Sequence, residues 1–162
     1  MKTIILIPSR LASTRLPNKP LKDIGGKPMI IRVQESAQKA NLGKVAVVSP
    51  DKEICSVVES AGGDYILTKN SHISGTDRIM EALHKVDPNR KFDTVVNLQG
   101  DMPNIDPQAI IHLISYMNKG QCDIGTLASS FNSESELIDE NNVKVAVKEK
   151  LMNNNFSKAT DF

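Results

Sequence analysis

The sequence predicts an α/β fold, with a Rossmann-like, doubly wound and mostly parallel sheet and helices on both faces. Short β-branched runs alternate along the chain with segments whose apolar residues recur at helical spacing. The runs are apolar at consecutive positions, as is typical of strands that a parallel sheet buries on both faces. A chain of 162 residues is long enough to bury such a core within one domain.

Five apolar runs are expected to form the strands of this sheet: 3–8, 44–49, 64–68, 93–98 and 123–128. Helices are expected between them, on apolar residues three or four apart within 30–40, 54–61, 79–86 and 110–117. Gly62-Gly63 and Lys119-Gly120 stand where helices should end. A further strand is expected at 143–148. The periodicity is then lost, so we predict one α/β domain over residues 1–150 and a poorly structured tail over 151–162.

Composition excludes several classes of protein. The formal net charge is +1, which gives no general reason to expect nucleic acid or a membrane surface as a partner. The two cysteines, Cys55 and Cys122, are expected to be reduced structural thiols, and His72, His84 and His112 lack metal-binding spacing. The first apolar run is too short for a signal peptide or membrane span, which favours a soluble cytoplasmic protein.

The loop after the first strand, residues 9–27, is unusually basic. It lacks both the G-x-G-x-x-G of dinucleotide-binding proteins and the G-x-x-x-x-G-K-[ST] phosphate loop. Five basic side chains stand against the single carboxylate of Asp23, a local excess of four positive charges: Arg10, Arg15, Lys19, Lys22 and Lys27. A polyphosphate would relieve their mutual repulsion, since arginine and lysine both bind phosphate oxygens. A solvated basic loop is the alternative.

Two more loops are expected at the same edge of the sheet, where ligands of such folds bind. "SGTDR" (74–78) predicts a helix start in which Ser74 is the N-cap and Asp77 completes a capping box. That start could serve capping alone or also bind an anion. "NLQGDMP" (97–103) places Asp101 at a strand end beside Gly100, a glycine that would let a ligand approach the backbone. This arrangement suits Mg²⁺ but also suits a simple turn.

Together, "IPSRLASTRLPNKPLKDIGGKPMI", "SGTDR" and "VVNLQGD" followed by Met-Pro resemble the bacterial CMP-Kdo synthetases, the 3-deoxy-manno-octulosonate cytidylyltransferases. The wider sugar nucleotidyltransferase group has an R-x-x-P-x-K-P-L loop, which is Arg15 to Leu21 here. The resemblance continues through "NNVKVAV" to about "FSKAT", so it covers nearly the whole chain. It implies a nucleotidyltransferase-like fold, with residues 1–150 as the nucleotide-binding domain.

The resemblance also implies a reaction for lipopolysaccharide biosynthesis: transfer of CMP from CTP to Kdo, with release of pyrophosphate and with Mg²⁺ as cofactor. Arg15, Lys19 and Asp101 would be catalytic, and Asp101 would also bind the metal. Gln99 and Lys158 would contact the sugar acid. The nucleotide would be bound by Arg10, Arg15, Lys19, Ser74, Gly75, Thr76, Arg78 and Gln99.

The chain departs from the family pattern in four respects. Met102 replaces a glutamate beside Asp101, Ser49-Pro50 replaces Thr-Asp with Asp51 displaced by one position, and Lys158 replaces an arginine. Members of the family also continue well past residue 162. We therefore expect much of the acceptor pocket, a second metal carboxylate and most contacts of the family's homodimer to be missing. Two alternatives remain: a nucleotide-binding remnant with little or no activity, or a cytidylyltransferase for another sugar acid.

Overall fold

A computed structural model describes residues 2–12, 16–120, 122–149 and 156–161. The contacts of the chain divide it into two compact units, Met1–Asp123 and Ile124–Phe162. Each unit is described by itself. The predicted division after residue 150 stays a prediction.

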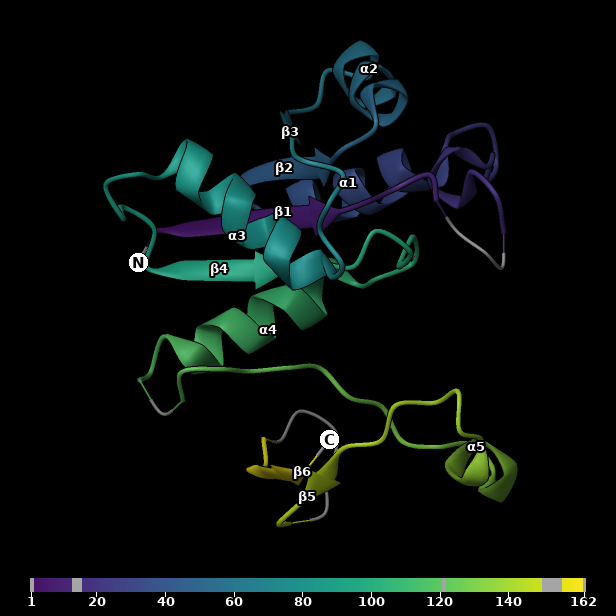
Figure 1. The fold of residues 1–162 in the computed structure, drawn as a ribbon. Coiled ribbons are helices and arrows are strands. Elements are labelled where there is room, and N and C mark those ends of the chain that lie inside the picture. The colour runs from purple at the N-terminus through teal and green to yellow at the C-terminus, as the bar shows by residue number, and fades with distance from the viewer. Residues whose placement is uncertain (1, 13–15, 121, 150–155, 162) are drawn as a thin grey trace. The chain divides into compact units, whose positions relative to one another are not determined.

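The first unit is built on a parallel sheet of four strands, in the order β3-β2-β1-β4 (Figure 1). These strands are β1 (Thr3–Pro8), β2 (Gly43–Ser49), β3 (Tyr65–Leu67) and β4 (Thr94–Asn97). β1 is central, with Thr3 beside Gly43 of β2 and beside Thr94 of β4. Four predicted strands and their parallel arrangement are therefore confirmed. The strand order reverses at β1, which makes the gap between the ends of β1 and β4 the topological switch point.

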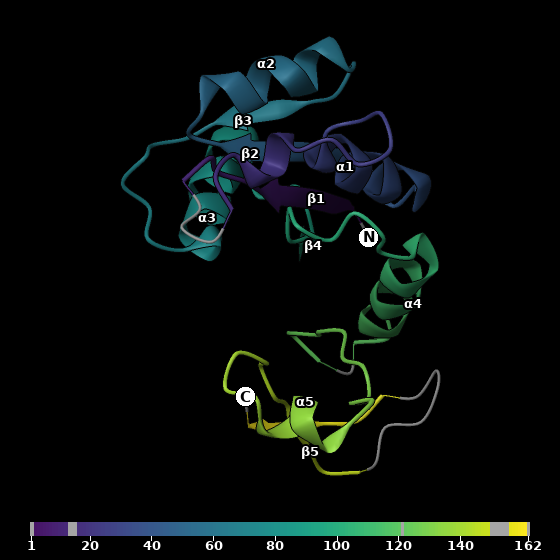
Figure 2. The same cartoon turned by 90° about the vertical axis from the view of Figure 1, so that its right-hand side faces the viewer.

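Helices cover both faces of this sheet, as predicted. The helices of this unit are α1 (Met29–Lys39), α2 (Lys52–Ser60), α3 (Gly75–Val86) and α4 (Pro107–Met117), with a short 3₁₀ helix, η1 (Lys19–Leu21). One core cluster joins α1, α2 and α4 to one face of the sheet, and a second joins α3 to the opposite face. Figure 2 shows the sheet between α1 and α3.

β1 shows why consecutive apolar residues make a central strand. Its side chains alternate between the two faces. Ile5 and Ile7 belong to the cluster with α1, whereas Ile4 and Leu6 belong to the cluster with α3. All four are completely buried. Fully burying side chains of this size stabilises the fold by roughly 1.5–3 kcal/mol each.

The start of β2 depends on a glycine. Gly43 has φ +151° and lies beside Thr3 of β1. A Cβ atom at this position would lie 2.1 Å from the backbone oxygen of Thr3, which real Cβ atoms do not approach so closely. The pairing of the two central strands therefore requires a residue without a side chain here.

The second unit differs from the prediction. The expected strand 123–128 is wrong: these residues form no strand, and Ile124 is 87% exposed. A strand exists only through pairing, and no described segment pairs with this one. The expected strand 143–148 is reduced to β5 (Ala146–Val147), which pairs antiparallel with β6 (Ala159–Asp161). A short helix, α5 (Glu134–Ile138), precedes them.

Two further expectations concern the cysteines and the membrane. Cys55 is buried and Cys122 is half-buried, and both are free thiols, as predicted. Among the helices of the described segments, none combines the length and apolar character that crossing a membrane would require.

Candidate functional site

A cleft of about 510 Å³ opens at the carboxyl ends of β1 and β4, at the topological switch point. Three connections form its walls: the loop after β1, the connection from β3 to α3, and the loop after β4. These are the three loops that the sequence predicts at this edge. Seven predicted site residues line the cleft: Arg10, Lys19, Ser74, Gly75, Arg78, Gln99 and Asp101.

The loop after β1 is held by its own backbone and by the end of β2. Asn18 adopts a left-handed conformation with φ 55°, and the amide of Leu21 donates to its carbonyl at 2.9 Å. Lys19 therefore begins the single turn of η1, where Pro20 is buried. Asp51, displaced by one position from the family pattern, reaches this loop: its carboxylate accepts a hydrogen bond from the amide of Leu11 at 2.8 Å.

Lys19 and Asp101 bring the first and third walls together. The Lys19 ammonium donates to the Asp101 carboxylate at 2.9 Å, and both side chains are partly exposed. An ion pair of this exposure contributes at most about 1 kcal/mol, so a ligand with stronger charges can separate the two groups. The pair keeps both charges inside the cleft, and each group remains able to bind a ligand.

Gly100 is required by the packing of the strand ends. A Cβ atom on Gly100 would lie 2.7 Å from the backbone oxygen of Pro8, at the end of β1. The sequence suggested that this glycine lets a ligand approach the backbone, but the closest approach in the structure is that of β1 itself. Next to it, the Gln99 amide donates to the Asn97 side chain at 3.0 Å, and Gln99 is exposed.

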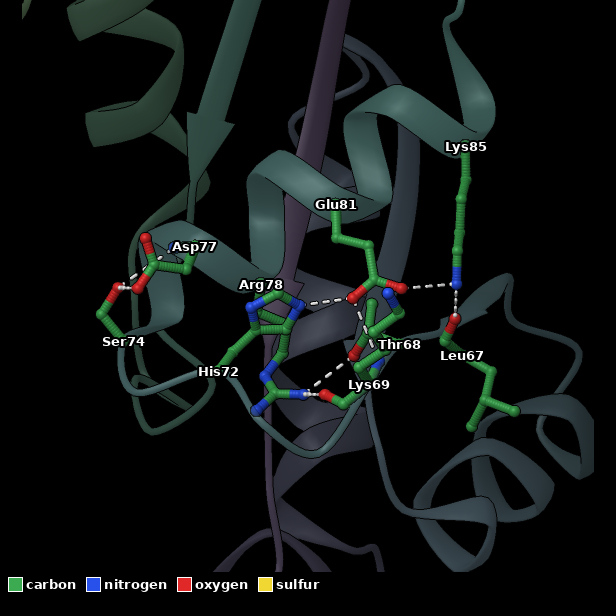
Figure 3. A network of polar contacts seen from close by, with 9 residues as sticks. All are labelled: Leu67, Thr68, Lys69, His72, Ser74, Asp77, Arg78, Glu81 and Lys85. Carbon is green, nitrogen blue, oxygen red and sulfur yellow. Dashed lines mark hydrogen bonds and ion pairs between the residues drawn. The ribbon is translucent and has the colours of Figure 1, made fainter.

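Arg78 is the deeply buried cation of the cleft, with an exposed fraction of 3%. Its Nη1 donates to the Thr68 hydroxyl at 2.8 Å and to the Lys69 carbonyl at 3.1 Å (Figure 3). Both acceptors are neutral, and no described carboxylate lies within ion-pair distance. Burial, with the positive charge of Arg10 as a second cause, lowers the pKa of the Arg78 guanidinium below its ordinary value. An anion in the cleft would relieve both effects.

Ser74 caps α3, as predicted. Its hydroxyl accepts from the Asp77 amide at 3.1 Å and donates to the Asp77 carboxylate at 2.7 Å (Figure 3). Before it stands Ile73, which lines the cleft although it is 91% exposed. The cap therefore fixes the residue at which the connection from β3, one wall of the cleft, ends and α3 begins.

The remaining predicted residues have different outcomes. Thr76 lies in the first turn of α3 and does not line the cleft. Lys158 belongs to the second unit, just before β6. Arg15 lies outside the described residues.

The sequence analysis missed Ser9. This residue follows β1 and lines the cleft, and its amide donates to the Val48 carbonyl at 2.9 Å. Its hydroxyl is buried and has no hydrogen-bond partner among the described residues. A buried hydroxyl without a partner is costly, so a ligand or water is expected to bond to it. Serine is common in turns, and only its burial distinguishes this one.

The cleft can hold a divalent cation only together with a ligand. Asp101 is the one described carboxylate that lines it, and no group of three metal-binding side chains occurs within the described ranges. Mg²⁺ is commonly bound by one or two carboxylates, with phosphate oxygens of the substrate and water completing its shell. Asp101 fits that arrangement.

Glu81, on α3, is expected to make the free energy of unfolding depend on pH. Contacts with Lys85, His72 and the amide of Lys69 lower the pKa of Glu81 from 4.5 to about 2. Because the pKa is lowered in the folded state, the stabilisation is present above pH 4.5 and is lost as the pH falls towards 2. Urea denaturation at about pH 6 and about pH 3 should show the stability difference between the wild type and Glu81→Gln shrinking at the lower pH. A difference that is equal at both values would contradict this assignment.

Comparisons with known proteins find related sequences over most of the chain. The cytidylyltransferase family model matches residues 4–161. A 3-deoxy-manno-octulosonate cytidylyltransferase of Brucella anthropi is 49% identical over 145 residues, which cover 90% of this chain and 58% of the relative. The corresponding protein of a Bradyrhizobium species is 48% identical over 143 residues, covering 88% of this chain and 58% of the relative. The chain thus spans little more than half the length of these relatives.

Solved structures give the same result. A CMP:2-keto-3-deoxy-manno-octonic acid synthetase complexed with CTP is 44% identical, with a TM-score of 0.69 over 74% of this chain and 48% of the other. A cytidylyltransferase from Leptospira borgpetersenii, 24% identical, has a TM-score of 0.64 over 75% of this chain and 50% of the other, and supports the fold alone. The family match over nearly the whole chain and the fold it shares with these structures lead to one conclusion: this chain belongs to the cytidylyltransferase family.

Proposed function

We propose that this chain carries the nucleotide site of a 3-deoxy-manno-octulosonate cytidylyltransferase, which transfers CMP from CTP to Kdo in lipopolysaccharide biosynthesis. The observation that carries the proposal is Arg78, a buried guanidinium without a carboxylate partner among the described residues, in a cleft that Arg10 and Lys19 also line. Such a cleft favours a polyanion. The names of the relatives, and the CTP bound to one solved structure, narrow the polyanion to CTP.

In the proposed reaction, the 2-hydroxyl of the sugar acid attacks the α-phosphorus of CTP. A bond forms between that oxygen and the phosphorus, the bond to pyrophosphate breaks, and the hydroxyl proton is released. Arg10 and Lys19, with Arg15 by resemblance, bind the triphosphate and stabilise the charge that develops on pyrophosphate. Preorganised charge of this kind is the main protein contribution to phosphoryl transfer.

The other residues position the nucleotide and the metal. In this assignment Ser74, Gly75 and Gln99 form the nucleoside side of the cleft, and Arg78 binds the nucleotide with its charge. A role for Thr76, in the first turn of α3, stays a prediction from the resemblance. Asp101, once separated from Lys19, would hold Mg²⁺, and the ion, when bound, would supply Lewis-acid activation of the phosphate. Gln99 is assigned to the sugar acid as well, and a role for Lys158 in binding that acid stays a prediction from the resemblance. We further place the reaction in the cytoplasm, without nucleic acid or membrane as a partner. A homodimer stays a prediction from the resemblance.

A pyrophosphate-release assay with CTP, Mg²⁺ and Kdo, combined with calorimetric titration of CTP, tests the proposal. CTP binding together with release of pyrophosphate supports it, and comparison with other sugar acids identifies the acceptor. Binding without release for any acceptor would favour the alternative, a nucleotide-binding protein that does not complete the transfer. Absence of CTP binding would overturn the nucleotide site itself.

Ser9 provides an independent check of the cleft. Ser9→Ala is expected to weaken CTP binding about fivefold, because it removes the hydroxyl that would donate a hydrogen bond to the ligand. Its stability should stay equal or rise slightly, since the substitution removes a buried polar atom that lacks a partner. Titration calorimetry and thermal unfolding measure the two effects. Unchanged affinity would show that Ser9 has no contact with the ligand.

A further inference from the structure

One face of α3 contacts the segment that leads from β3 to the cleft. Arg78, Glu81 and Lys85 are three or four residues apart and so project from the same side of the helix. Arg78 bonds to Thr68 and to the Lys69 carbonyl, and Lys85 donates to the Leu67 carbonyl at 2.7 Å. Figure 3 shows these side chains directed at the same stretch of backbone.

Glu81 is the centre of these contacts. Its carboxylate accepts from the Lys69 amide at 3.0 Å and bonds to the imidazole of His72, and it forms an ion pair with Lys85 at 2.7 Å. Only 14% of the Glu81 side chain is exposed. One carboxylate thus holds the segment at two points, Lys69 by its backbone amide and His72 by its side chain.

The segment depends on such contacts because it has no regular structure. Between Leu67 and Gly75 the chain belongs to neither a helix nor a strand. Yet this stretch delivers Ile73 and Ser74 to the cleft. Without Glu81, Lys69 keeps only the bond of its carbonyl to Arg78, and no other described contact holds His72 or the residues between it and the cap at Ser74. The wall would then sample several conformations.

We propose that Glu81 is a positioning residue for nucleotide binding: it fixes the backbone of residues 69–73 so that this wall is formed before the nucleotide arrives. The proposal rests on the proposed function, since it assumes that the cleft binds CTP. Glu81 itself does not line the cleft and acts through the segment that it holds. Preorganisation of this kind increases affinity by avoiding the cost of ordering a loop on binding.

Titration of CTP into four proteins tests the proposal: the wild type, Glu81→Ala, Glu81→Gln and Glu59→Ala. Glu59 is an exposed glutamate on α2, away from these contacts, and is the matched control. The Kd for CTP should rise about tenfold in Glu81→Ala. Glu81→Gln keeps an acceptor oxygen for the Lys69 amide and should retain most of the affinity, while Glu59→Ala should match the wild type.

Hydrogen exchange of the Lys69 amide, measured without nucleotide, separates this proposal from the proposed function. Exchange should accelerate at least tenfold in Glu81→Ala while the amides of β1 stay protected. Faster exchange with unchanged CTP affinity would reduce Glu81 to a structural role and overturn the proposal. Unchanged exchange would overturn it as well. If the wild type fails to bind CTP, the proposed function and the role in binding both fail, and the exchange data still decide whether Glu81 fixes this wall.

A double-mutant cycle with His72→Ala adds a measurement that a general loss of stability would not reproduce. Because His72 and Glu81 act through one contact, the double variant should bind CTP about as weakly as Glu81→Ala alone. If the fold-increases in Kd of the two single variants multiply in the double variant, the two residues act independently, which would contradict the proposal.

Discussion

Gly43→Ala is expected to lower the free energy of unfolding by about 3 kcal/mol or more. The added Cβ atom would lie 2.1 Å from the backbone oxygen of Thr3, and the φ of +151° is strained for any residue with a side chain. Relief requires β1 and β2 to separate at their first pair. Since β1 is the central strand, the shift would reach both core clusters. Urea denaturation of the two proteins measures the difference.

Gly62→Ala is the matched control. Gly62 also has a positive φ, +74°, but a Cβ atom there would meet nothing within 4 Å. Only the backbone penalty remains, about 1–2 kcal/mol. Equal losses in the two variants would show that the contact with Thr3 contributes nothing beyond backbone strain.

Lys19→Met should weaken CTP binding about 30-fold, or roughly 2 kcal/mol, as expected for the loss of a hydrogen bond to a charged phosphate. Methionine keeps an unbranched side chain of similar length, so the turn of η1 should be preserved. The variant also frees Asp101 from its ion pair, so the fold should lose at most about 1 kcal/mol. Titration calorimetry at fixed salt measures the affinity, and thermal unfolding checks the fold.

Lys22→Met removes the same charge from the same loop at an exposed position that does not line the cleft. Salt screens an exposed charge that makes no contact in the cleft, and the Kd should change less than about twofold. If both variants lose affinity equally, the loop acts through its overall charge. The specific placement of Lys19 at the start of η1 would then be irrelevant to binding.

The four strands of the first unit could be predicted from the sequence because their runs are continuous and apolar. A central strand of a parallel sheet, buried on both faces, is one of the few structures that such short runs form. The run 123–128 has similar composition, but it forms no strand within the described chain. Composition shows that a segment can enter a sheet. Whether it does so depends on a neighbouring edge, which local sequence does not reveal.

The site divides in the same way. The position of Arg10, Lys19 and Asp101 in the cleft could be predicted because all three stand in loops that follow parallel strands, whose carboxyl ends meet at one edge of the sheet. The burial of Ser9, the contacts of Glu81 and the hydrogen bond of Asp51 with Leu11 could not be predicted. Each depends on residues distant in the chain. Likewise, Gly100 looked like a ligand-facing glycine, and only the structure shows Pro8 against it.

The central place of β1 has a consequence for how the protein is made. β1 leaves the ribosome before the other strands of its sheet, yet one of its edges pairs with β4, which begins only at Thr94. Until β4 has emerged, that edge keeps its backbone groups unpaired beside four of the most apolar residues of the chain. During this interval of synthesis the nascent chain is most exposed to aggregation, and pairing so distant in sequence also slows folding.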